Sequence, residues 1–205
     1  MDKKHIILKT AFQLFLKNGF SEVSANEVIR EAQVTKGGFY HYFKSKDDLI
    51  NEVIKLFVCP YFKEPFDTLI EEIKENGIYG KVEKRLRDCY MVITVITVEG
   101  CYEEMGTVDF RDFQFLVYEG MKKYPYLADL NCQYTRKRRQ LMRQLLEEGK
   151  QEGVIAESVD TEVYAMTMIA LRDGMIALQV LDPAIDAKEK CDITFHSLWN
   201  EIKAG

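Results

Sequence analysis

The stretch that decides the fold is SANEVIREAQVTKGGFYHYFKSKDDL, residues 24–49. Three hydroxyl residues in it, Ser24, Thr35 and Ser45, each stand directly before a helical run, where a side-chain oxygen can accept a hydrogen bond from the free N–H groups of the first turn. An acidic residue three positions after each serine is typical of a capping box. The pattern predicts two short helices separated by a tight turn and followed at once by a third helix, which is the helix-turn-helix arrangement.

A further helix precedes this stretch. Leu8, Ala11, Phe12 and Phe15 recur at the spacing of one helical face, and Gly19 stands where a C-terminal cap is expected. Residues 1–47 are therefore interpreted as a separate helix-turn-helix domain.

The remainder, residues 48–205, is interpreted as a second helical domain. Helical periodicity predicts four runs, near 81–90, 127–152, 161–181 and 191–202. Pro60 and Pro65 are expected to bend or end the helix that begins at Ser45. Val92–Val98 is rich in β-branched residues, but no partner strand is evident, so we expect a buried helix there. The predicted fold class is all-α, with about nine helices.

Composition fits a soluble protein, with 47% hydrophobic and 30% charged residues. No apolar run reaches the ~20 residues that span a bilayer, and no secretory signal is visible, so we expect a cytoplasmic protein without a membrane partner. The five cysteines are scattered and include no Cys-x-x-Cys, which argues against disulfides and a structural zinc site. No metal site is expected.

Charge changes sign along the chain although the net charge is −5. Residues 1–55 contain nine Lys/Arg against seven Asp/Glu, whereas the rest contains 19 against 26. The segment 33–46 has three lysines and no acid. A small basic surface on an acidic protein suits phosphate contact, because the local field and not the total charge governs it.

Motifs of common enzymes are absent from the sequence. It contains no Gly-x-Gly-x-x-Gly, no Walker loop, no Gly-x-Ser-x-Gly and no His-Glu-x-x-His. We therefore expect neither enzyme activity nor a cofactor.

The first quarter of the chain resembles the N-terminal signature of the TetR family of transcription regulators. The matching positions are Leu14, Phe15, Gly19, Phe20, Val28, Ala32, Val34, Thr35, Lys36, Gly37, Phe39, Tyr40, Tyr42, Phe43, Lys46 and Leu49. The resemblance implies an N-terminal three-helix DNA-binding domain followed by a helical-bundle domain that binds an effector and dimerises. One departure is Gln33, which stands where the family usually has glycine and would cost ~1 kcal/mol if its φ is positive.

The resemblance also implies that the third helix enters the major groove of a palindromic operator in double-stranded DNA. Lys36 and the helix start favour phosphate, and the two glycines that follow allow the backbone to approach DNA closely. Phe39 and Phe43 are four residues apart and are expected in the core. The predicted DNA-binding residues are Asn26, Thr35, Lys36, Gly37, Gly38, Tyr40, His41, Tyr42 and Lys46.

A small-molecule effector site in the second domain is implied as well. Aromatic and apolar side chains there suit the walls of a pocket, although they suit an ordinary core equally. The candidates are Tyr61, Phe62, Tyr90, Tyr102, Phe110, Phe113, Tyr118 and Met121. The basic run Arg136–Arg139 covers a full helical turn and is expected to be a solvated face.

The last two predicted helices carry more apolar surface than a terminal hairpin leaves in water. Pairing with the same hairpin of a second copy would cover it, so we expect a four-helix homodimer interface. Its predicted members are Met168, Leu171, Met175, Phe195, Leu198, Trp199 and Ile202.

The predicted function is a DNA-binding transcription regulator, in the usual manner of the family a ligand-responsive repressor. The alternatives are a ligand-dependent activator and a small-molecule or thiol sensor that acts through protein partners. A redox switch through Cys89 or Cys101 is a further hypothesis.

Overall fold

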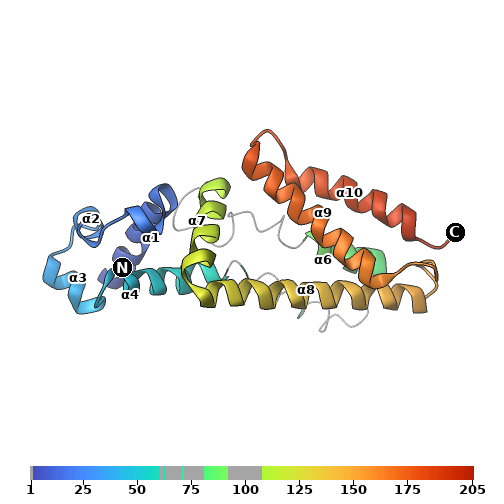
Figure 1. The fold of residues 1–205 in the computed structure, drawn as a ribbon, viewed down its shortest axis with the longest axis horizontal. Coiled ribbons are helices and arrows are strands. Elements are labelled where there is room, and N and C mark those ends of the chain that lie inside the picture. Colours follow the sequence, from blue (N-terminus) through green and yellow to red (C-terminus); the bar gives the residue numbers. More distant parts are fainter. Residues whose placement is uncertain (1, 61, 63–70, 72–80, 92–107) are drawn as a thin grey trace. The chain divides into compact units, whose positions relative to one another are not determined.

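The computed structural model of the chain describes residues 2–60, 62, 71, 81–91 and 108–205. These residues are mostly helical, and the strand-like pairing among them is the isolated bridge between Ile155 and Lys203 (Figure 1). The predicted all-α class is confirmed. Val92–Val98 and Pro65 lie outside the described residues.

The helices follow one another as Figure 1 labels them. They are α1 (Lys3–Glu22), α2 (Ala25–Glu31), α3 (Lys36–Tyr42), α4 (Lys46–Val53), the π-helical turn η1 (Ile54–Val58), α6 (Val82–Met91), α7 (Phe110–Lys123), α8 (Pro125–Gln151), α9 (Thr161–Leu181) and α10 (Ala187–Ile202). The four runs predicted beyond residue 80 agree with α6, α8, α9 and α10 to within a few residues. The chain is helical from Lys46 through Pro60, with the π-helical turn η1 just before Pro60, and residue 61 lies outside the described residues.

All three predicted caps are present. The side-chain oxygens of Ser24, Thr35 and Ser45 each accept a hydrogen bond at 3.1 Å from the backbone N–H three residues later. Beside the Ser45 cap, Asp48 accepts a hydrogen bond from the N–H of Lys44, the residue that precedes the cap, at 2.9 Å. Local hydrogen bonds over three or four residues therefore fix where α2, α3 and α4 begin.

The sequence predicts that the first helix ends at Gly19, but Gly19 interrupts α1 instead. Its φ of 79° and ψ of 165° are not helical, and one more turn follows before the helix ends at Glu22. The positive φ favours glycine, and a Cβ at this position would also lie 2.6 Å from Oε2 of Glu119, so that side chain would have to shift.

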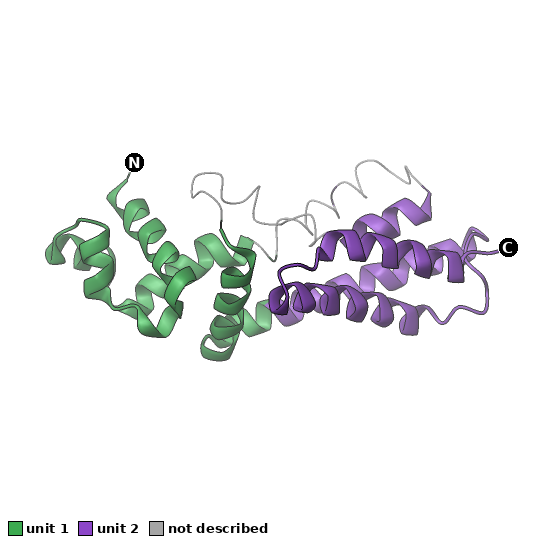
Figure 2. Ribbon diagram, turned by 90° about the horizontal axis from the view of Figure 1, so that it is seen from above, with its two compact units in different colours: residues 1–62, 98–130 green, residues 63–97, 131–205 purple. Residues whose placement is uncertain are grey.

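The chain divides into two compact units, which Figure 2 colours separately. Unit 1 is Met1–Phe62 with Val98–Leu130, and unit 2 is Lys63–Thr97 with Asn131–Gly205. In unit 1, α1 packs against α2, α4 and α7 around buried phenylalanines, and this unit contains the predicted helix-turn-helix domain, residues 1–47. In unit 2, α6, α9 and α10 pack together with the C-terminal part of α8.

Candidate nucleic-acid interface

Helix α3 has one face anchored in the core and the other exposed. Phe39 and Phe43 are fully buried, with ring centroids 5.5 Å apart, which confirms their predicted core position. Tyr40 is 45% exposed, and Lys36 and His41 are exposed. The helix therefore presents a cation, a phenol and an imidazole to solvent from a rigid aromatic base.

The turn between α2 and α3 is fixed by three backbone hydrogen bonds. The N–H groups of residues 32, 33 and 34 donate to the carbonyls of Val28, Arg30 and Ile29 at 2.8, 3.1 and 3.2 Å. Gln33 has a φ of 54°, so the left-handed conformation that the family usually fills with glycine is present here. The predicted strain at Gln33 is thus located at the turn that sets the angle of α3.

The two glycines of α3 differ in their surroundings. A Cβ on Gly38 would meet Oγ1 of Thr35 at 3.1 Å, whereas a Cβ on Gly37 would meet no atom within 4 Å. Packing inside the chain therefore does not require glycine at position 37. Close contact with the backbone or a base edge of DNA would be a reason for glycine at this position.

The other predicted contact residues occupy varied positions. Asn26 is exposed in the first turn of α2, and Tyr42 is half-buried with its ring 4.9 Å from that of His41. The hydroxyl of Thr35 caps α3. Lys46 is half-buried, and its ammonium donates to the carbonyl of Ser21 at 3.0 Å. Lys46 thus joins the start of α4 to the end of α1, in addition to any phosphate contact.

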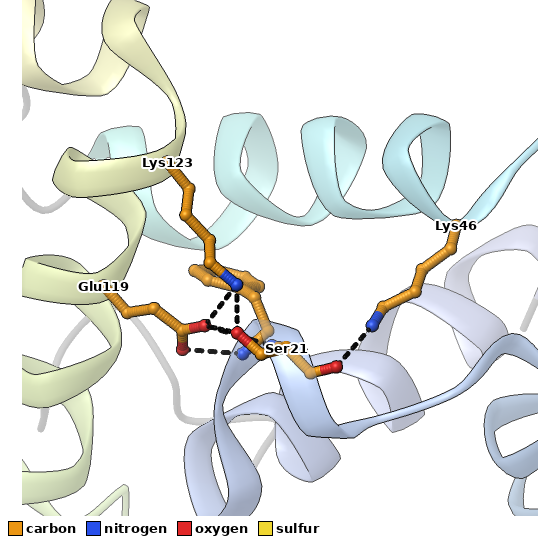
Figure 3. Close-up of polar contacts among 5 residues, drawn as sticks. Ser21, Lys46, Glu119 and Lys123 are labelled. Carbon is orange, nitrogen blue, oxygen red and sulfur yellow. Dashed lines mark hydrogen bonds and ion pairs between the residues drawn. The ribbon is translucent and has the colours of Figure 1, made fainter.

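Glu119 of α7 holds the end of α1 through a cluster that the sequence did not reveal (Figure 3). Its carboxylate accepts from the N–H of Phe20 at 2.8 Å and from the N–H of Ser21 at 3.0 Å. It also accepts from the Ser21 hydroxyl and pairs with Lys123 at 3.1 Å. Because the break at Gly19 frees the two N–H groups, Glu119 replaces the acceptors that a continuous helix would have supplied.

The pKa of Glu119 reflects two opposed effects. Partial burial raises it, but the hydrogen bonds from Ser21 and Phe20 and the charge of Lys123 outweigh burial and hold the pKa below its ordinary value. The carboxylate is therefore ionised near neutral pH, which suits four simultaneous donors.

The described effector candidates are divided between the two compact units. Phe62 and Phe113 are buried in unit 1, and Tyr90 is buried in unit 2. The ring of Phe113 lies edge-on to Phe12 of α1, with centroids 6.5 Å apart, so Phe113 packs in the core of unit 1. Phe110 and Met121 are half-buried, Tyr118 is exposed, and Tyr61 and Tyr102 lie outside the described residues.

The expected solvated face at Arg136–Arg139 needs a correction. Arg136, Lys137 and Arg139 are exposed, but Arg138 is only 2% exposed and pairs with Asp173 of α9 at 2.8 Å. A full helical turn cannot place four consecutive residues on one side, and Arg138 is the one that faces inward.

Several predicted dimer residues belong to the chain's own core. Met168, Phe195 and Ile202 are fully buried and Leu198 nearly so, while Leu171, Met175 and Trp199 pack partly buried against them. The apolar surface left open on α9 is formed by different residues, Val163, Met166, Leu178 and Leu181, which are 45–74% exposed.

Helix α9 is long and apolar enough to cross a membrane by length and composition, and 28% of its most apolar window is buried. Arg172 and Asp173 form an ion pair at 2.6 Å in the middle of it, which is costly in hydrocarbon. The helix also packs against α10. These features argue against a position of α9 in hydrocarbon.

The thiol of Cys89 is fully buried. Burial raises its pKa to about 12 even though Arg138 lowers it, so the unreactive thiol form is favoured. A redox switch through Cys89 is therefore disfavoured, and Cys101 lies outside the described residues.

Residues 7–53 match the family model described as bacterial regulatory proteins, tetR family. The uncharacterized HTH-type transcriptional regulator YuxN of Bacillus subtilis is 34% identical over 76 residues, which cover 37% of this chain and 24% of YuxN. The chain thus spans about a quarter of the length of that relative. The HTH-type transcriptional regulator PksA of Bacillus subtilis is 25% identical over 184 residues, which cover 90% of this chain and 82% of PksA.

The fold is similar to that of solved structures along its whole length. A protein from Saccharomonospora viridis, solved in complex with choline, matches with a TM-score of 0.70 and 18% identity over 98% of each chain. At this identity the likeness concerns the fold. It extends beyond the helix-turn-helix segment to the second domain.

Proposed function

We propose that this chain, which belongs to the TetR family through its N-terminal domain, is a cytoplasmic transcription regulator that binds an operator in double-stranded DNA as a homodimer and responds to a small molecule. The observation that carries the proposal is the exposed face of α3, with Lys36, Tyr40 and His41 outward on a base of buried phenylalanines. Residues 1–47 are the proposed DNA-binding domain, and residues 48–205 the effector-binding and dimerisation domain.

The residue types on α3 suit DNA. Lysine contacts phosphate, and a tyrosine hydroxyl can donate to phosphate or to a base edge. The absence of acidic residues from 33–46 leaves the local field positive in an acidic chain. The proposed contact set also contains Asn26, Thr35, Tyr42 and Lys46, together with the backbone of Gly37 and Gly38.

A second copy is the proposed cover of the open α9 face. Exposed Val163, Met166, Leu178 and Leu181 lie on one long helix, and Ile193 of α10 is 54% exposed. A symmetric pairing would remove this surface from water and place two α3 helices on a palindromic site. Repression by occupying a promoter is the simplest outcome.

Fluorescence anisotropy with DNA fragments from around the protein's own gene tests the proposal. We expect one fragment to bind with an affinity that falls steeply as salt rises, because phosphate contacts release counterions. Competition with unrelated DNA of equal length measures specificity. Equal affinity for all fragments would contradict an operator-binding function.

Sedimentation analysis tests the dimer. Leu178→Glu places a charge on the open α9 face and is expected to weaken self-association at least ~10-fold. Leu56→Glu is the matched control, because Leu56 is an equally exposed leucine on η1 in unit 1. A monomeric wild-type protein, or equal effects of the two substitutions, would refute this interface.

A further inference from the structure

Two arginines in the interior of unit 2 share one carboxylate. Arg172 of α9 is 1% exposed, and Arg138 of α8 is 2% exposed. Nη1 of Arg172 lies 2.6 Å from Oδ1 of Asp173, and Nη2 of Arg138 lies 2.8 Å from Oδ2 of the same residue. Half of the Asp173 side chain is exposed. Two buried cations therefore face a single, partly hydrated anion.

Two buried polar atoms of these arginines, Nε of Arg138 and Nε of Arg172, have no hydrogen-bond partner among the described residues. The hydroxyl of Tyr90 interacts with the thiol of Cys191, and burial, Cys191 and Asp173 together raise the pKa of Tyr90. A guanidinium can only donate, so an acceptor is what the two Nε atoms lack.

Arg85 of α6, in the same unit, shows the opposite balance. It is 9% exposed and lies 2.6 Å from Glu148 and 3.5 Å from Glu152. Its Nε is also unpaired, but two carboxylates already face its single charge. The excess of positive charge is therefore particular to Arg138 and Arg172.

An uncompensated charge in an apolar core is unfavourable unless a counter-charge reaches it. The core of the same unit is apolar, since Met168, Phe195 and Cys89 are fully buried in it and Leu171 and Met175 pack against it. Such surroundings exclude most water and strengthen any ionic hydrogen bond formed there.

We propose that Arg138 and Arg172 bind the anionic group of the effector, and that this effector is an organic carboxylate with an apolar body. The planar guanidinium fork matches a carboxylate through paired hydrogen bonds. The apolar neighbours suit the remainder of such a molecule. This inference rests on the proposed function only where it identifies the ligand as the effector.

Thermal melting of the full chain tests the site with four probes. Octanoate and benzoate carry the carboxylate, while 1-octanol and benzyl alcohol are their neutral counterparts. At ~100-fold excess over the dissociation constant, we expect at least one carboxylate to raise the melting temperature by about 5 °C or more. The matching alcohol should shift it far less.

Two substitutions separate an anion site from a structural ion pair. Arg172→Met keeps the volume and removes the excess charge, so the ligand-free melting temperature should stay equal or rise while the carboxylate shift disappears. Arg85→Met is the control, because it leaves two carboxylates without their cation. It should lower the ligand-free melting temperature and retain the carboxylate shift.

The proposal is overturned if neither carboxylate stabilises the wild-type protein, or if Arg172→Met destabilises the ligand-free chain as much as Arg85→Met does. DNA anisotropy with the same probes separates this result from the proposed function. Operator binding without a carboxylate shift would refute only the anion site. A carboxylate that raises the melting temperature but leaves DNA affinity unchanged would support the site and refute its effector role.

Discussion

Helix α3 and the α8–α9 pair carry their positive charge in opposite ways. On α3, Lys36 is exposed above fully buried phenylalanines, whereas Arg138 and Arg172 point into the core and share Asp173. An exposed lysine remains hydrated and is available to an external phosphate at little cost. A buried guanidinium is costly without a counter-charge. The comparison distinguishes an exposed surface that suits a large polyanion outside the protein from an interior site that, as we propose, binds a small anion.

The largest expected effect comes from truncating one side chain on each face of α3 and comparing the loss of stability. Phe39→Ala removes a fully buried ring and should lower the free energy of unfolding by ~3–5 kcal/mol. Tyr40→Ala removes its exposed neighbour and should change it by less than ~1 kcal/mol. Urea unfolding followed by circular dichroism measures both. Similar losses for the two variants would show that α3 has no free face.

Glu119 tests whether unit 1 depends on a long-range acceptor. Glu119→Ala leaves the N–H groups of Phe20 and Ser21 without their partner and should cost ~1–3 kcal/mol. Because the folded-state pKa lies below the ordinary value of 4.5, the stabilisation is complete above that value and is lost as the pH falls through the lower folded pKa.

Unfolding measured from pH 7 down to pH 3 checks this dependence. The wild-type protein should lose stability in the acid range more steeply than Glu119→Gln, which cannot ionise. Parallel curves for the two proteins would mean that the Glu119 charge contributes nothing.

Gln33 gives a smaller effect with the opposite sign. Its positive φ is unfavourable for a side chain with a Cβ, so Gln33→Gly should raise the free energy of unfolding by up to ~1 kcal/mol. Gln13→Gly, at an exposed position inside α1, is the control and should lower it by a similar amount. A destabilising Gln33→Gly would mean that the glutamine side chain has a role of its own.

The smallest stability change is expected at Gly37, where DNA binding is the informative readout. Alanine fits there without a clash and favours helix, so Gly37→Ala should be neutral or stabilising by less than ~1 kcal/mol. If the backbone of α3 approaches DNA closely, the same variant binds the operator more weakly. Unchanged affinity would leave the glycine without a DNA-contact role.

The helix-turn-helix was predictable because its signals are local. The caps at Ser24, Thr35 and Ser45 act over three residues, and the strain at Gln33 depends on its own φ. Glu119 was not predictable, because it lies 98 residues from Ser21 and nothing in either segment indicates the other. Gly19 is the related signal in the sequence, because a Cβ at that position would lie close to the Glu119 carboxylate.

In the second domain the helices were predictable from the sequence, but the position of a binding site was not. A run of four basic residues does not reveal that Arg138 alone turns inward, nor that it meets Asp173 35 residues away. Aromatic composition likewise could not reveal that Phe113 packs on Phe12 of α1. Which face of a helix is buried depends on neighbours that are distant in sequence, so helical periodicity alone could not predict the burial of Arg138 or the packing of Phe113.

The operator affinity of Lys36→Ala tests the central claim most directly, namely that the exposed face of α3 contacts DNA. Relative to the wild-type protein and to Lys188→Ala, an exposed lysine of α10, Lys36→Ala should bind the operator about tenfold or more weakly. The salt dependence of its binding should also be reduced by about one phosphate contact per subunit. Affinity and salt dependence equal to those of Lys188→Ala would contradict the claim.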